Sequence, residues 1–263
     1  MTDYLDKFSL QGKKAVVVGG LGLIGRAAVD DLAQAGARVV AADIDETKPK
    51  EFLASARKYH KAVTLRYLDI TDGENLQRNV SDIINDLKGV DIWVTAAYPR
   101  TADWGAGIEQ VSIDSWRTNV DMQLNVVAMC CAWAAKAMKA KGGSIINLGS
   151  IYGVVGGNFR LYEQTKVKPV SMIYSAVKGG LINLGRTMAS YWGKYNIRVN
   201  TVCPGGVFDN QDRRFLARYN RQVPLGRMAK PEDVAGAILF LASEASSYIT
   251  GTVFMVDGGW TAV

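Results

Sequence analysis

The sequence predicts an α/β fold, a doubly wound parallel sheet of about seven strands with helices on both faces, as in Rossmann-like proteins. Short apolar runs rich in β-branched residues alternate with stretches in which apolar residues recur at the helical period. A glycine-rich turn also follows the first apolar run and opens the first helical stretch. Because strands that alternate with helices pair in parallel and are covered on both faces, these observations indicate the doubly wound class.

The predicted elements follow one another without a break. Strands are expected over residues 14–19, 38–43, 62–68, 90–95, 143–148, 197–202 and 252–256. Helices are expected from the glycine turn to about 36, after the second strand to about 60, after the third to about 87, and over about 112–140 and 173–195. No repeat or linker divides the chain, so residues 1–263 are expected to form a single domain. Segments at about 154–172 and 206–230 are expected to be loops at the carboxyl ends of the strands, where ligands usually bind.

Composition and charge exclude several classes of protein. Formal net charge is +6, but the chain has no dense run of Lys or Arg, so nucleic acid is not an expected partner. The longest nearly apolar run, residues 124–135, is too short to span a bilayer, and the N-terminus lacks the pattern of a signal peptide. Cys130, Cys131 and Cys203 form no CxxC pair, which is typical of a reducing compartment. A cytoplasmic protein without membrane association is therefore expected.

The chain has a single histidine, His60, which lies far from the other motifs and is expected at the surface. One histidine excludes a metal site with two or more histidine ligands. It also leaves no indication of a Ser–His hydrolase site. No metal is therefore predicted.

A candidate phosphate-binding turn lies between the first strand and the first helix. It consists of Gly19, Gly20, Leu21, Gly22, Leu23, Ile24 and Gly25. Glycines allow a tight turn and close approach of the backbone to a pyrophosphate, and a helix N-terminus supplies free N–H groups. A lone glycine pattern is weak, but this one stands in the strand–turn–helix context that a dinucleotide site needs. The alternative is a glycine turn without a ligand.

Asp43 ends the second predicted strand, 18 residues after Gly25. A carboxylate in this position accepts hydrogen bonds from the adenosine ribose hydroxyls and repels a 2′-phosphate. No Arg or Lys lies within the glycine turn or directly after Asp43. NAD is therefore predicted in preference to NADP.

Ser150, Tyr174 and Lys178 are the candidate catalytic residues. A Tyr and a Lys four residues apart lie on one face of a helix, where the ammonium can lower the pKa of the phenol. Such a phenol can give a proton to a carbonyl oxygen or take one from an alcohol. Ser150 follows the fifth predicted strand and would offer its hydroxyl to the same oxygen. With a nicotinamide cofactor, this combination predicts hydride transfer between an alcohol and a carbonyl.

A second Tyr–Lys pair, Tyr162 and Lys166, has the same spacing and lies closer to Ser150. Pro169 follows Lys166 by three residues, so a long helix cannot continue through this segment. Tyr174 instead begins an amphipathic helix that leads into the sixth strand. The sequence therefore favours Tyr174, and Tyr162 is expected in a loop.

Over nearly its whole length the chain resembles the short-chain dehydrogenases/reductases, single-domain type. The resemblance rests on the glycine turn, Asp43, and the motifs LDI (68–70), NLGS (147–150), YSAVK (174–178), IRVN (197–200), PG (204–205), ITG (249–251) and VDGG (256–259). It implies a Rossmann-like fold, a bound NAD or NADP, and a homotetramer or dimer built partly through two long helices. Family members from bacterial surface-polysaccharide pathways are the most similar in the stretch from Ser150 to Asp209.

The resemblance also implies site residues. Asp69 and Ile70 would bracket the adenine, and Pro204, Gly205 and Val207 would line the nicotinamide side. Tyr174 and Lys178 would also contact the cofactor, and Lys178 would hold the nicotinamide ribose in addition to acting on Tyr174.

The chain departs from the family pattern at several places. Gln123 stands where the family has an Asn that holds a relay water near the Lys, and Gln123 is predicted to take that role in altered form. The alternative is that Gln123 is an ordinary helix residue without a part in the relay. The family's Asn-Asn-Ala-Gly after the fourth strand is replaced by Thr95-Ala96-Ala97-Tyr98, with Ala96 and Ala97 still expected at the cofactor. Leu23 replaces the middle glycine of the phosphate turn, and Asp209 replaces a Thr.

The substrate is predicted from the two variable segments. Between Ser150 and Tyr174 lie 23 residues, roughly ten more than is usual in the family, and residues 213–230 are rich in Arg. Basic residues around a cleft attract anions. The candidate substrate residues are Tyr152, Arg160, Tyr162, Asp209, Arg214 and Arg218. The alternative is that the charges are solvated helix faces.

Three functions are compatible with these patterns. The first is an NAD(P)-dependent oxidoreductase of a secondary alcohol or ketone on a polar sugar-like or anionic substrate. The second is a general ketoreductase for hydrophobic ketones or acyl substrates. The third is a non-catalytic dinucleotide-binding protein, which the retained Ser150, Tyr174 and Lys178 disfavour.

Overall fold

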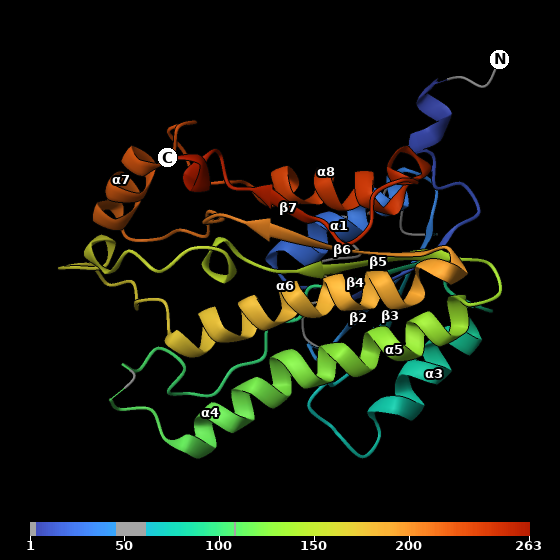
Figure 1. Ribbon diagram of the computed structural model, residues 1–263, viewed down its shortest axis with the longest axis horizontal. Coiled ribbons are helices and arrows are strands. Elements are labelled where there is room, and N and C mark those ends of the chain that lie inside the picture. Colours follow the sequence, from blue (N-terminus) through green and yellow to red (C-terminus); the bar gives the residue numbers. More distant parts are fainter. Residues whose placement is uncertain (1–3, 46–61, 108) are drawn as a thin grey trace.

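A parallel sheet lies at the centre of the computed structural model, which describes residues 4–45, 62–107 and 109–263 (Figure 1). Its strands in the described part of the chain are β1 (Lys14–Val18), β2 (Arg38–Asp43), β3 (Val63–Tyr67), β4 (Ile92–Thr95), β5 (Gly143–Leu148), β6 (Ile197–Pro204) and β7 (Val253–Val256). The order is β3-β2-β1-β4-β5-β6-β7, with every neighbouring pair parallel. This confirms the predicted fold class. The order reverses between β1 and β4, and doubly wound sheets bind ligands at that point.

Helices cover both faces of the sheet (Figure 1). The helices described are α1 (Leu23–Gln34), α3 (Leu76–Asp86), α4 (Ile113–Val120), α5 (Val126–Met138), α6 (Met172–Trp192), α7 (Arg213–Gln222) and α8 (Pro231–Ala242). Successive side chains of a strand point to opposite faces. Val16 therefore packs with residues of α3, α5 and α6, and Val17 with residues of α1 and α8. The continuous apolar runs of the sequence reflect this burial on both sides.

Two helices were not among the predicted elements. The segment expected as a loop at 206–230 contains α7, and α8 follows it. The Asp212 side chain caps α7 by accepting hydrogen bonds from the backbone N–H groups of Arg214 and Phe215, and Pro231 occupies the first turn of α8. Both are known start signals for helices. The sequence of α7 is short, rich in Arg and mostly polar, which is also typical of a surface loop.

The long helix predicted over 112–140 is present with an interruption. α4 and α5 are joined by a π-helical turn, Asp121–Asn125, which holds Gln123. The helix predicted between the second strand and residue 60 falls mostly outside the described residues, and so does His60.

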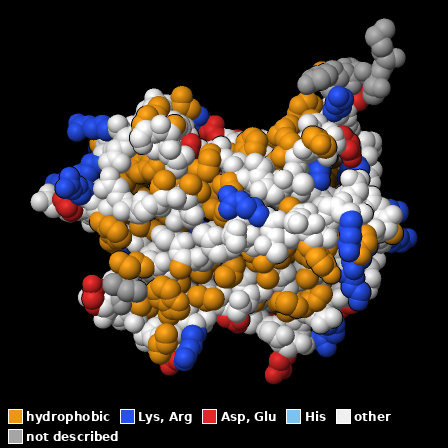
Figure 2. All heavy atoms as spheres, in the orientation of Figure 1, with side chains coloured by type: hydrophobic (Ala, Val, Ile, Leu, Met, Phe, Trp, Pro, Cys, Tyr) orange, Lys and Arg blue, Asp and Glu red, His pale blue; other side chains and the backbone are white. Residues whose placement is uncertain are grey.

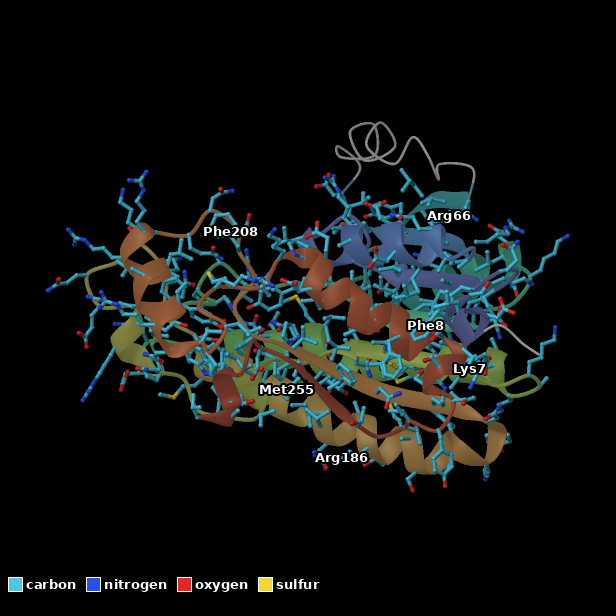
Figure 3. The ribbon with its side chains drawn as sticks, turned by 90° about the horizontal axis from the view of Figure 1, so that it is seen from above. Lys7, Phe8, Arg66, Arg186, Phe208 and Met255 are labelled. Atoms are coloured by element: carbon cyan, nitrogen blue, oxygen red, sulfur yellow. The ribbon has the colours of Figure 1, made fainter. Side chains whose placement is uncertain are left out.

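The carboxyl ends of the strands face the end of the molecule that carries α7. Figure 3 shows Phe208, which follows β6, on the loop towards α7, whereas Lys7 and Phe8 lie towards the opposite end. Gly19, Ala96, Ser150 and Gly205 all follow the carboxyl ends of their strands. None of the described helices combines the length and the apolar character needed to cross a membrane.

Candidate active site

A cavity of about 710 Å³ contains the Ser150 and Tyr174 side chains. Its wall is unusually aromatic, with Tyr98, Trp104, Tyr152, Tyr162, Tyr174, Phe215 and Tyr219 among the lining residues. Pro204, Gly205 and Val207 also line this cavity, on the side where the resemblance placed the nicotinamide. The structure thus brings residues from β5, α6, β6 and α7 together around one space.

A second cavity, of about 650 Å³, lies along the glycine turn. Its lining includes the predicted cofactor residues Gly19, Gly22, Leu23, Ile24, Gly25, Asp43, Asp69, Ile70, Ala96 and Ala97. Ile24, Tyr98 and Arg100 line both cavities. The two spaces are therefore adjacent, with Tyr98 and Arg100 between the glycine turn and the Ser150–Tyr174 pair.

The glycine turn fits a pyrophosphate. Gly19 has a φ of +78°, and a Cβ on it would lie 2.5 Å from the backbone N of Ala97. A Cβ on Gly25 would overlap the carbonyl oxygen of Gly19. Among the described residues no side chain caps the N-terminus of α1, and its first turn holds no acidic residue. The backbone N–H groups and the positive end of the helix dipole are therefore available to an anion.

Asp43 lies at the carboxyl end of β2 and supports the same turn. One carboxylate oxygen accepts a hydrogen bond from Leu21 N at 2.9 Å, and the other accepts one from Asp45 N at 3.1 Å. Leu21 itself is buried and lines neither cavity, so it acts through its backbone. A carboxylate has about four acceptor positions, so Asp43 retains the capacity to accept from a ribose.

Local hydrogen bonds fix the catalytic candidates. The Ser171 side chain caps α6 by accepting from Tyr174 N at 3.1 Å, which starts the helix that carries Tyr174 and Lys178. Lys178 is buried, and its Nζ donates to the Leu148 carbonyl oxygen at 2.7 Å. Ser150 is also buried and lies two residues after Leu148, so the end of β5 positions both side chains.

Burial dominates the ionisation of both α6 residues. It raises the pKa of Tyr174, which a hydrogen bond from Ser150 partly offsets, and it lowers the pKa of Lys178 to about 8. In this structure burial and Ser150 account for the shift of the Tyr174 pKa, and the predicted effect of Lys178 on it stays a prediction. The Lys178 ammonium lies 5.6 Å from the centre of the Tyr174 ring and donates its hydrogen bond to a backbone carbonyl.

Three aromatic rings pack together on the wall of the cavity that contains Ser150 and Tyr174. Tyr98 packs edge-on against Trp104 and Tyr174, with ring centroids 5.7 and 5.6 Å apart, and Trp104 lies 5.8 Å from Tyr174. Edge-to-face contacts at such distances stabilise a fixed arrangement. This cluster forms a rigid apolar wall beside the reacting hydroxyl.

Comparison with known proteins identifies the family. A family model described as enoyl-(acyl carrier protein) reductase matches residues 22–261. A solved short-chain dehydrogenase from Leptospira borgpetersenii with bound NAD⁺ is 30% identical, with a TM-score of 0.84 over 99% of this chain and 96% of that one. The chain belongs to the short-chain dehydrogenase/reductase family. It is an oxidoreductase that acts on CH–OH groups or the corresponding ketones, and the fold of this family binds a nicotinamide dinucleotide.

Other similar proteins differ in their substrates. A cis-4-hydroxycyclohexanecarboxylate dehydrogenase from Sinomonas cyclohexanicum is 34% identical over 95% of this chain and 96% of its own length. A post-translational flagellin modification protein A from Campylobacter coli is 32% identical over 95% and 99%. It fits the resemblance to family members from surface-polysaccharide pathways. A solved gluconate 5-dehydrogenase from Burkholderia cenocepacia, in complex with NADP and tartrate, has a TM-score of 0.86 at 26% identity, over 99% and 100%.

Tyr162, the alternative to Tyr174, lies in the long segment that precedes α6 in this short-chain dehydrogenase (residues 154–172, the insertion). Its hydroxyl is 3.2 Å from the Tyr152 hydroxyl, and its ring packs 5.3 Å from Phe215. The segment from Tyr162 to Lys166 is made of turns and is not helical. Tyr152 and Tyr162 both line the cavity, as predicted for substrate residues, and the two hydroxyls face each other on its wall.

Gln123 lies at the π-helical turn and lines neither cavity. Its side chain is buried; Nε2 donates to Asn119 Oδ1 at 3.4 Å, and Oε1 has no hydrogen-bond partner among the described residues. The neighbouring Leu124 packs against Gly180, two residues after Lys178. Turns of π-helix often occur at functional sites, and this one packs through Leu124 against the part of α6 that follows Lys178.

Four predicted substrate residues lie outside the cavity around Ser150 and Tyr174. Three of them lie where the helix α7 docks on the insertion. Arg214 donates to the Gln164 carbonyl oxygen at 3.4 Å, and Arg218 donates to the carbonyl oxygens of Arg160 and Glu163. Arg160, Arg214 and Arg218 do not line the cavity, so the structure gives no support to their predicted contact with substrate. Asp209 lines the cavity along the glycine turn instead of the substrate side.

Several wall residues were missed from the sequence. Arg100 and Trp104 follow β4 directly, and loops after the carboxyl ends of parallel strands are where ligand contacts concentrate. Lys168, which lies between Ser150 and Tyr174 in the sequence, also lines the cavity. The described residues contain no group of three or more His, Cys, Asp or Glu side chains that could hold a metal ion.

Proposed function

We propose that this protein transfers a hydride between a nicotinamide dinucleotide, preferably NAD, and the carbinol or carbonyl carbon of a polar, sugar-like or anionic substrate. The observation that carries the proposal is the adjacency of the two cavities, one along the glycine turn and Asp43, the other around Ser150 and Tyr174. A dinucleotide held along the first has its reactive end at the second. When bound, its nicotinamide supplies the hydride donor or acceptor.

The chain's own residues handle the proton and the oxygen. Ser150 donates a hydrogen bond to the substrate oxygen, and Tyr174 gives that oxygen its proton during reduction or removes it during oxidation. Because burial raises the pKa of Tyr174, the protonated phenol prevails at neutral pH. Ketone reduction is therefore favoured at neutral pH, and alcohol oxidation increases as the pH rises. We place Gln123 behind Lys178, where its unpartnered amide oxygen can accept a hydrogen bond from a relay water.

Two features support a polar or anionic substrate over a hydrophobic ketone. Hydroxyls of Tyr152 and Tyr162 stand on the cavity wall with Ser150, Ser171 and Gln211. The similar proteins named for substrates act on a hydroxycyclohexanecarboxylate and on gluconate. A panel of sugars, sugar acids, cyclic hydroxy acids and aliphatic ketones, each assayed with NADH and NADPH, tests the proposal. Turnover confined to hydrophobic ketones or acyl substrates would favour a general ketoreductase instead.

The preference for NAD rests on the Asp43 carboxylate, which lines the dinucleotide cavity and repels a 2′-phosphate. The substitution Asp43→Asn retains an oxygen for Leu21 N and removes the charge. We expect the wild-type kcat/KM ratio of NAD over NADP to fall about tenfold or more in this variant, because the repulsion is lost. Steady-state kinetics with both cofactors measures the ratio. A wild-type preference for NADP would contradict the assignment.

The helices on the α4–α6 side provide the surface for a homo-oligomer, which we propose to be a tetramer or dimer. Figure 2 shows hydrophobic side chains gathered over this face. Exposed apolar residues there include Ile113, Met129 and Met172. Large exposed apolar patches are typical of interaction sites. We also propose a single catalytic domain and a cytoplasmic location, in keeping with the buried free thiols of Cys130, Cys131 and Cys203.

A further inference from the structure

The charged side chains that line the cavity around Ser150 and Tyr174 are all cationic. Among the described residues its lining contains Arg100 and Lys168 but no Asp or Glu. Neither side chain forms an ion pair with a described carboxylate, whereas Arg227 is paired with Asp233 at 2.6 Å. The two cations therefore contribute positive potential to the cavity without a protein counter-ion.

Arg100 is held in place by its neighbours. Its guanidinium lies 5.1 Å from the centre of the Tyr98 ring, and Tyr98 is packed against Trp104 and Tyr174. The following residue, Thr101, is tied to α4: its N–H donates to Asn119 Oδ1 at 3.3 Å, and Asn119 Nδ2 donates to its hydroxyl at 2.7 Å. Asn119 is buried, so the loop that carries Arg100 has a rigid support.

Lys168 approaches from the insertion on the other side. A Cβ on Gly105 would lie 2.8 Å from Lys168 Cδ, so the aliphatic part of Lys168 runs across the backbone of the loop that holds Trp104. Lysine side chains commonly pack their methylene groups in this way and leave the ammonium in a polar space. The loop after β4 and the insertion before α6 thus meet, and each contributes one cation.

Ser150 and the two cations occupy different parts of the cavity. Ser150 is buried, whereas the side chains of Lys168 and of Arg100, which also lines the dinucleotide cavity, are exposed. Between them stand the rings of Tyr98, Trp104 and Tyr174, which suit the carbon face of a cyclic molecule. A substrate that reaches its reacting oxygen to Ser150 would therefore present its far end to the two cations.

We propose that Arg100 and Lys168 bind an anionic substituent of the substrate, and that the substrate is a cyclic secondary alcohol, or its ketone, with this substituent on the opposite side from the reacting carbon. This inference rests on the proposed function. Arg100 and Lys168, which line the cavity, thereby take the anion-binding role that the sequence suggested for Arg214 and Arg218, whose guanidinium groups bind the insertion. Guanidinium and ammonium groups are suited to carboxylate and phosphate.

The test compares charged and neutral ligands of the same shape. 4-Oxocyclohexanecarboxylate and its carboxamide are assayed for reduction, with a sugar 6-phosphate and the free sugar as the phosphate arm. Cyclohexanecarboxylate and cyclohexanecarboxamide are titrated calorimetrically, so that binding is measured whether or not turnover occurs. We expect wild type to favour the anion by about tenfold or more, the gain of a charge-assisted hydrogen bond.

The variants Arg100→Gln and Lys168→Met are expected to remove most of this preference while the neutral ligand changes less than about threefold. Arg214→Gln and Lys166→Met are the matched controls, because neither residue lines the cavity, and both should leave the preference intact. An absent anion preference in wild type, or one unchanged in Arg100→Gln and Lys168→Met, overturns the inference. If the inference is overturned but the neutral polar ketones are reduced, the proposed function still stands. If hydride is transferred to none of the ketones, the proposed function itself is rejected.

Discussion

The variant Tyr174→Phe is expected to lower kcat by about 10²–10⁴-fold, the usual contribution of a positioned general acid or base. The phenol oxygen is the group that moves the proton, and Phe keeps the ring that packs against Tyr98 and Trp104. Dinucleotide affinity should therefore change little. Steady-state kinetics gives kcat, and quenching of tryptophan fluorescence by NADH gives the affinity.

Tyr162→Phe is the matched control for this prediction. Tyr162 lines the same cavity and also precedes a lysine by four residues, but its hydroxyl faces Tyr152. Its loss should change kcat by less than about tenfold, because it leaves the proton-transfer step intact. Equal losses in the two variants, or a larger loss for Tyr162→Phe, would show that the wrong tyrosine has been assigned.

A single methyl group at Gly19 is expected to abolish dinucleotide binding and to destabilise the fold. Gly19 has a φ of +78°, which costs a non-glycine residue about 1–3 kcal/mol. The added Cβ would also lie 2.5 Å from the Ala97 backbone, so β1 and β4 cannot keep their approach at the switch point. We expect Gly19→Ala to lose about 3 kcal/mol or more of unfolding free energy, combining this strain with the overlap. Urea denaturation and NADH titration measure both effects.

Gly12→Ala separates the two causes. Gly12 has the same φ of +78°, but nothing lies within 4 Å of a Cβ built there, and it lines neither cavity. This variant should lose only the conformational part, about 1 kcal/mol, and bind NADH as wild type does. If Gly12→Ala is as unstable as Gly19→Ala, the backbone conformation alone accounts for the effect and the close approach to Ala97 does not.

The sheet was predictable because its signals are local. A strand buried on both faces must be a short apolar run, and a phosphate turn needs glycine, so Gly19, Gly25 and Asp43 could be read directly. Ser150 and Tyr174 could be paired through the fold, since residues after β5 and at the start of α6 meet at one sheet edge. α7 was not predicted because it is a ten-residue, mostly polar stretch rich in Arg, a composition that is also typical of a loop.

The side-chain contacts of the site could not be predicted in the same way. The sequence places Arg214 and Arg218 in a basic segment near the site, but the direction of each guanidinium depends on how α7 docks on the insertion. Likewise, the spacing of Tyr174 and Lys178 predicts their proximity and not the 2.7 Å hydrogen bond that directs the ammonium to Leu148. Long polar side chains find partners through tertiary contacts, which spacing alone does not specify.

The central claim is that Ser150, Tyr174 and Lys178 act on an oxygen whose carbon exchanges a hydride with the dinucleotide. The most direct measurement supplies NADH carrying deuterium at the transferable C4 position, together with 4-oxocyclohexanecarboxylate and the wider ketone panel, and locates the deuterium by NMR. The account predicts deuterium on the carbinol carbon of a product, and its loss in Tyr174→Phe with NADH binding preserved. Tight NADH binding by wild type with no deuterium transferred to any member of the panel would contradict it and identify a non-catalytic dinucleotide-binding protein.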